Sequence, residues 1–183
     1  LRRRPINLKR FYSVWGFWIN LLLFGSIIAS VIYLLARRMG VMALVDLIWT
    51  AGLGLSAIAY FATQVEVGVR AFVVFLVIVI WSGRLSSYLF TNRVLAGKED
   101  PRYAYLTKHW GLRAPRNYYF LFVLQVVLVA LFLLPVSVAM ESSVSAWNLF
   151  DWLGLSIALI ALIGEATADQ QLARFRADVS NKG

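Results

Sequence analysis

Five long apolar segments constrain what this chain can fold into. They cover residues 15–36, 42–62, 71–90, 118–140 and 147–164, and each has about the 20 residues that an α-helix needs to cross a bilayer. The polar–apolar alternation of a membrane β-barrel is absent, so helices must satisfy the backbone hydrogen bonds. The sequence therefore predicts an all-α, polytopic membrane helix bundle with about five transmembrane helices.

The chain shows no internal repeat and no low-complexity linker, so we expect a single transmembrane domain over residues 1–183. Three stretches are polar: a basic N-terminal segment at 1–13, a long interfacial loop at 91–117 and a polar tail at 170–183. We expect the loop to contain short interfacial helical pieces and no sheet.

The net charge of +9 comes from cations that flank the apolar segments. This placement favours phospholipid headgroups as partners and argues against nucleic acid. The loop at 91–117 and the polar tail carry more cations than the opposite side, which places them on the inner side of the membrane. The basic N-terminus argues for the reverse orientation.

Cysteine is absent and His109 is the only histidine. Disulfides, thiolate chemistry and metal sites built from cysteines or several histidines are therefore excluded. His109 stands in a charged loop and is expected to be an ordinary surface or headgroup-facing residue.

The chain begins at Leu1 with an arginine-rich, acid-free stretch. Such a start resembles the end of an organellar transit peptide, and equally a basic segment next to a membrane helix. We expect an organelle membrane, either the mitochondrial inner membrane or the endoplasmic reticulum.

Five polar residues in or at the ends of the apolar segments fall in the half of the membrane on the side of the long loop: Asp46, Arg84, Gln125, Glu165 and Asp169. Glu165 and Asp169 are four residues apart and share a helix face, and Arg176 follows seven residues later. Charged side chains at such depth need partners. The pattern predicts a polar vestibule in which Arg84 pairs with Asp46, Glu165 or Asp169; the alternatives are a solvated helix end and polar contacts between helices. Gln125 is the one uncharged residue among these five.

Two sequence blocks carry a family signature. The first contains WSGRL at 81–85 and GKEDPRY at 97–103; the second contains EATADQQL at 165–172 and ends in NKG at 181–183. Together they resemble the DUF1295 group of membrane proteins. That group is similar to steroid 5-alpha-reductases and, more distantly, to isoprenylcysteine carboxyl methyltransferases.

The resemblance implies a seven-helix membrane bundle that holds NADPH in a cavity open to the cytosol, of which this chain covers the N-terminal five-helix portion. It implies cofactor contacts at Arg84, Glu165, Asp169 and Arg176. Arginines suit phosphates, and carboxylates suit ribose or amide donors.

The chain departs from the steroid reductases at the substrate. Those enzymes polarise a ketone with a Gln-Glu pair in the second helix and a tyrosine in the third, where this chain has Asp46, Trp49 and Trp81. No catalytic residue is therefore assigned, and a steroid substrate is not expected.

The resemblance also implies a further motif and two helices after the segment that ends here at Gly183. For a chain with this ending we expect no useful NADPH affinity and a non-catalytic, accessory role in a larger membrane complex with other membrane subunits. The first alternative is an active NADPH-dependent reductase acting on a C=C bond of a lipid, with its last helices missing. A membrane methyltransferase is the other.

Overall fold

The computed structural model describes residues 8–95, 97, 99–141 and 146–178. Within these ranges every regular element is helical, which confirms the predicted all-α class. Five segments are long and apolar enough to cross a membrane, as predicted: Trp15–Met39, Leu44–Phe61, Val69–Val94, Pro101–Met140 and Leu149–Phe175. The chain is an integral membrane protein.

The long loop is largely helical, as expected. A π-helical turn extends the third helix, and a 3-10 turn joins a short helix to the next long one. The first helix begins before residue 15, so it includes part of the basic N-terminal segment. The elements are α1 (Leu8–Met39), α2 (Leu44–Phe61), α3 (Val69–Leu89), η1 (Phe90–Val94), α4 (Pro101–Trp110), η2 (Gly111–Arg113), α5 (Ala114–Met140) and α6 (Leu149–Ala177).

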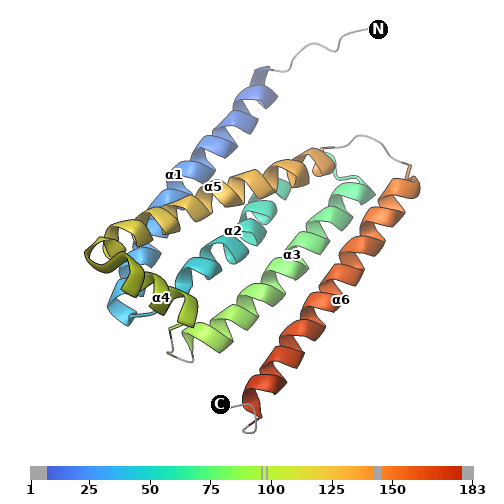
Figure 1. Cartoon of the computed structure of the whole chain (residues 1–183). Helices are drawn as coiled ribbons and strands as arrows, with labels where there is room; N and C mark the ends of the chain where they lie inside the picture. Colours follow the sequence, from blue (N-terminus) through green and yellow to red (C-terminus); the bar gives the residue numbers. More distant parts are fainter. Residues whose placement is uncertain (1–7, 96, 98, 142–145, 179–183) are drawn as a thin grey trace.

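Helix α5 forms the centre of the bundle and packs against α1, α2 and α3 (Figure 1). Its side chains Tyr118, Phe122 and Leu133 are among the most deeply buried of the described residues. Helix α6 lies along the outer side of α3, and no residue of its apolar stretch is buried in the bundle. The core therefore consists of α1, α2, α3 and α5, and α6 is a peripheral helix.

Small residues allow α2 and α3 to approach closely. Ser82 Oγ donates a hydrogen bond to the Thr50 carbonyl oxygen at 2.6 Å, and Ser86 Oγ donates to Thr50 Oγ1 at 3.1 Å. A Cβ on Gly54 would overlap the Ser82 side chain. Close contact of small residues and hydrogen bonds between helices are the usual means of helix association in a membrane.

We predict that Gly54→Ala destabilises the bundle by about 1–3 kcal/mol, because the added methyl group forces α2 and α3 apart. Gly83→Ala is the matched control, since a Cβ on Gly83 meets nothing within 4 Å. This control should be neutral or stabilising by up to about 1 kcal/mol through helix propensity. Thermal unfolding in detergent measures both, and equal effects would contradict the close approach.

Two acidic residues stand just before α4, and the first of them joins this segment to the start of α2. The Glu99 carboxylate accepts hydrogen bonds from the backbone N–H groups of Met42 and Ala43, the latter at 3.1 Å, and so caps α2 from a distance in sequence. Asp100 caps α4 itself by accepting from Arg102 N at 2.9 Å, ahead of Pro101 in the first turn. The segment before α4 thus stabilises the first turns of both α2 and α4.

The carboxyl group of Asp100 makes this cap sensitive to pH. Its hydrogen bond with the Arg102 side chain, above all, holds the pKa of Asp100 below the usual 3.8. A carboxyl whose pKa is lowered by folding stabilises the fold above its ordinary pKa, and this contribution is lost as the pH falls through the folded value.

We therefore predict that lowering the pH reduces the stability of the unmodified chain more than that of the Asp100→Asn variant, because only the unmodified chain has a carboxylate to protonate at the α4 cap. The variant retains a capping oxygen but has no charge to titrate. Thermal unfolding measured from about pH 6 to about pH 3 should show the two stabilities converging at the acidic end. Parallel profiles would show that Asp100 does not make this contribution.

Candidate functional site

Arg84 stands at the centre of a polar group shared by α3 and α6. Its Nη2 atom forms an ion pair with Glu165 Oε1 at 2.7 Å, and its Nη1 donates to Asp169 Oδ2 at 2.8 Å. Trp81 Nε1 donates to the other Glu165 oxygen, Oε2, at 2.9 Å. We call Trp81, Arg84, Glu165 and Asp169 the Arg84 site. Its three charged side chains are between 22% and 34% exposed, so they are partly desolvated.

Helical spacing explains why these four side chains meet. Trp81 and Arg84 are three residues apart on α3, and Glu165 and Asp169 are four apart on α6, so each pair occupies one helix face. The predicted pairing of Arg84 with Glu165 or Asp169 is confirmed, because both carboxylates bind the guanidinium. Arg176 lies in α6, but its side chain is outside the described residues.

The same two helices are joined a second time on the opposite side of the membrane. Arg70 near the start of α3 binds Asp151 near the start of α6 through two parallel bonds, Nε to Oδ1 and Nη2 to Oδ2, both 2.7 Å long. Arg70 and Arg84 are 14 residues apart, as are Asp151 and Glu165. On each helix the two ion-paired positions are separated by two heptads. Both positions therefore lie on the same face of the helix, and the two helices run parallel.

Asp46 is not part of the Arg84 site. Its carboxylate pairs with Arg93 of η1 and, at 3.1 Å, with Arg102 Nη2 of α4, and it accepts from the Tyr103 hydroxyl at 2.6 Å. Asp100 adds a second carboxylate to these arginines. We call Asp46, Arg93, Asp100, Arg102 and Tyr103 the Asp46 cluster.

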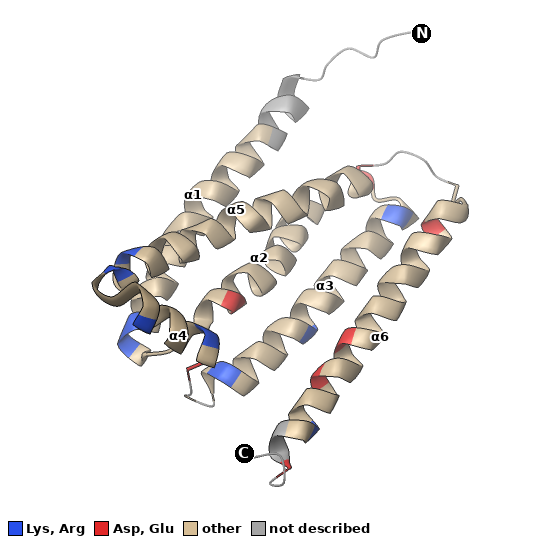
Figure 2. Cartoon of the chain, viewed as in Figure 1, with Lys and Arg blue, Asp and Glu red and all other residues tan. Residues whose placement is uncertain are grey.

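The single vestibule expected from sequence is thus two separate polar groups. Asp46 lies at the start of α2, where η1 and α4 fold back over it, whereas Arg84 faces outward to α6. Gln125 belongs to neither group; it is buried on α5 and donates to the Leu121 carbonyl oxygen at 3.3 Å. Figure 2 shows that most charged residues collect at the end of the bundle that carries α4. The expected concentration of charge on the long-loop side is therefore present, although one shared site is not.

Two important ion-pair partners were not singled out from the sequence. Arg70 falls in a short connection and Asp151 inside the predicted apolar segment 147–164, although their spacing to Arg84 and Glu165 carries the same heptad signal. Glu99 was noted only as part of a motif. Its capping of α2 has no local signal, because it bonds to residues 56 and 57 positions earlier.

The comparisons with known proteins add one finding. The family model described as "Protein of unknown function (DUF1295)" matches residues 32–183. The chain belongs to this family. No curated protein and no solved structure matches it. The matched range contains both the Arg84 site and the Asp46 cluster, so both lie within the family's domain.

The chemistry open to the Arg84 site follows from its charge. One guanidinium lies between two carboxylates, which leaves the group with one excess negative charge. A phosphate would have to displace Glu165 or Asp169 and accept their repulsion. As the structure has it, the site joins α3 to α6.

We predict that Arg84→Gln lowers the stability of the chain by about 1–3 kcal/mol, because it leaves two carboxylates without their cation at the membrane boundary. The loss is below that of a fully buried pair, since the side chains keep some exposure. Arg84→Lys should be intermediate: it keeps the charge but cannot bridge both carboxylates with a planar fork. Thermal unfolding in lipid nanodiscs measures the series, and unchanged stability in Arg84→Gln would contradict the role.

Proposed function

We propose that this protein is a non-catalytic, structural subunit of a larger membrane assembly, built on a scaffold derived from NAD(P)H-dependent membrane reductases. The observation that carries the proposal is the Arg84 site. Three of the residues expected to contact a cofactor, Arg84, Glu165 and Asp169, instead form ion pairs with one another and attach α6.

The exposed surface of α6 supports the same proposal. Between its two ion-paired positions, α6 presents large apolar side chains that no described part of the bundle covers. In a membrane, a helix held mainly by ion pairs at two levels offers the rest of its surface to neighbouring helices or ordered lipid. The most exposed of these side chains are Trp152, Ile157, Ile160 and Ile163.

The partners of this role are membrane lipids and the helices of other membrane subunits. An organelle membrane, mitochondrial or of the endoplasmic reticulum, is our proposed location, on the strength of the arginine-rich N-terminal segment. The proposal involves no nucleic acid, because the cations cluster where headgroups lie.

The second candidate is an NADPH-dependent reductase acting on a C=C bond of a lipid. It is favoured by the likeness of the 81–111 and 165–183 blocks to the steroid 5-alpha-reductases. In this candidate NADPH phosphates take the place of Glu165 or Asp169 on Arg84. Arg176, in the last turn of α6, would contribute a second cation.

We predict that NADPH does not raise the unfolding temperature of the purified chain. A ligand that binds only the folded state stabilises it by an amount that grows with the logarithm of one plus the ratio of ligand concentration to Kd, so a bound cofactor would be detected even without activity. Arg84→Gln and Arg70→Gln should then lower stability by comparable amounts, since each removes one of the two α3–α6 attachments.

The reductase candidate gives the opposite result. NADPH would stabilise the unmodified chain and Arg70→Gln, and it would fail to stabilise Arg84→Gln. Arg70→Gln is the matched control because it breaks the same kind of ion pair between the same helices on the other side of the membrane. Saturable binding of NADPH that depends on Arg84 would overturn the structural role.

A further inference from the structure

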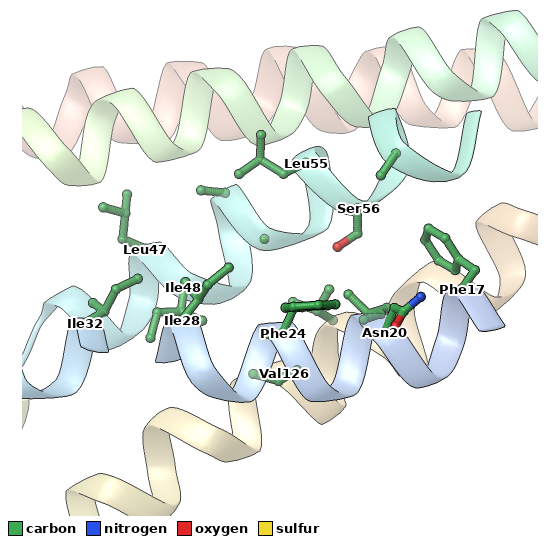
Figure 3. A pocket seen from close by; sticks show the side chains of 16 residues that line it. Phe17, Asn20, Phe24, Ile28, Ile32, Leu47, Ile48, Leu55, Ser56 and Val126 are labelled. Carbon is green, nitrogen blue, oxygen red and sulfur yellow. The ribbon is translucent and has the colours of Figure 1, made fainter. Parts of the chain in front are cut away.

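An apolar groove runs along the outside of the core between α1 and α2. The two helices are close at the turn around Gly40 and separate from there, and α5 closes the floor (Figures 1 and 3). The cavity measures about 470 Å³. Its lining includes Phe17, Phe24, Ile28 and Ile32 of α1 and Leu47 and Leu55 of α2.

The groove lies within the spans of α1 and α2 and is open at the side. Among the described residues that line it, only Asn20 and Ser56 are polar, so hydrocarbon is the medium that suits it. From Phe17 to Ile32, α1 rises about 22 Å, which is most of the hydrocarbon thickness of a bilayer. The groove is thus long, narrow and parallel to lipid chains.

Its size decides what kind of molecule fits. A helix with its side chains is about 10 Å across. A helix lying along this length is therefore too wide to enter the groove of 470 Å³ completely. A single flexible hydrocarbon chain has the required shape.

A cation stands at the long-loop end of the groove. Arg38 follows Ile32, the last groove residue of α1, by six residues or about 9 Å of helix rise, and it lies on the edge of α1 that Asn20 occupies five turns earlier. Arg38 is exposed, and no carboxylate of the described residues forms an ion pair with it. Its neighbour Arg37 points elsewhere, with its guanidinium 5.8 Å from the Tyr33 ring.

We propose that the groove binds one hydrocarbon chain of an anionic phospholipid, with the lipid phosphate held by Arg38. The guanidinium of an arginine binds a phosphate well. In a phospholipid whose headgroup carries no cation, the phosphate has no positive partner within the lipid itself, so its charge favours pairing with Arg38. This inference uses neither α6 nor the Arg84 site, so it stands independently of the proposed function.

The preference for an anionic headgroup is tested by measuring which lipid stays bound to the chain. The chain is reconstituted in nanodiscs of phosphatidylcholine with a minor fraction of phosphatidylglycerol, released, and weighed by native mass spectrometry. We expect phosphatidylglycerol to be retained over phosphatidylcholine by about fivefold, the contribution of one arginine near an anionic headgroup.

Arg38→Gln should abolish this preference, and Arg37→Gln, the adjacent cation of the same helix end, should keep it. Equal retention of the two lipids by the unmodified chain would overturn the proposal. So would an equal loss of preference in the two variants.

The groove is tested by filling it. Ala51 lines the groove, and Ala51→Phe should reduce the retention of both lipids severalfold. Ala161→Phe, on the exposed surface of α6, is the matched control and should leave retention unchanged. Equal retention by the two variants would overturn the assignment of the lipid to this groove.

A measurement that needs no disruptive variant uses the absence of cysteine. Ile28→Cys places a fluorophore in the groove, and Ile160→Cys places it on α6, at side chains that are 56% and 71% exposed. With brominated phosphatidylglycerol as a minor component, quenching should be stronger at position 28 than at position 160. With brominated phosphatidylcholine this difference should vanish, and equal quenching by phosphatidylglycerol at both positions would contradict the proposal.

Discussion

A polar side chain within a bilayer has no water to pair with, and it must find a partner in the protein. The arrangement of the outer helices follows from this constraint. Arg70 and Arg84 each bind carboxylates of α6, and these bonds hold that helix against α3 without burying its apolar stretch. Association by ion pairs at two levels requires no close packing between them. It leaves most of the surface of α6 available to lipid or to other helices.

The inner helices meet the same constraint by other means. Hydrogen bonds cross the α2–α3 contact between Thr50, Ser82 and Ser86. Gly54 has no side chain, which allows the two helices to approach closely there. Glu99 and the Asp46 cluster pair the exposed start of α2 with α4 and η1. The bonds between α2 and α3 replace water that hydrocarbon cannot supply. The core is therefore specified by small and polar residues as much as by apolar volume.

The two proposals concern different surfaces of one bundle. The α3–α6 side carries paired charges and an uncovered apolar helix, which suits contact with further membrane subunits. The α1–α2 side carries a groove with the exposed Arg38 beyond its end, which suits a lipid. Under these proposals the bundle is a membrane scaffold with separate protein and lipid contacts.

Local features of the sequence determined the helices. The five spans, the helical pieces between 91 and 117 and the meeting of Arg84 with Glu165 and Asp169 all follow from hydropathy, length and three- or four-residue spacing. Such features depend on a few neighbouring positions, so a single sequence displays them. The same applies to the concentration of charge on the long-loop side, which follows from counting spans.

Only the tertiary structure decided how the helices combine. It separated Asp46 from Arg84, because η1 and α4 fold back over the start of α2 while Arg84 faces the other way. It paired Arg70 with Asp151, joined Glu99 to α2 and opened the groove between α1 and α2. These outcomes depend on the register and crossing of helices that are distant in sequence. Packing of many side chains sets both, and no local pattern records the result.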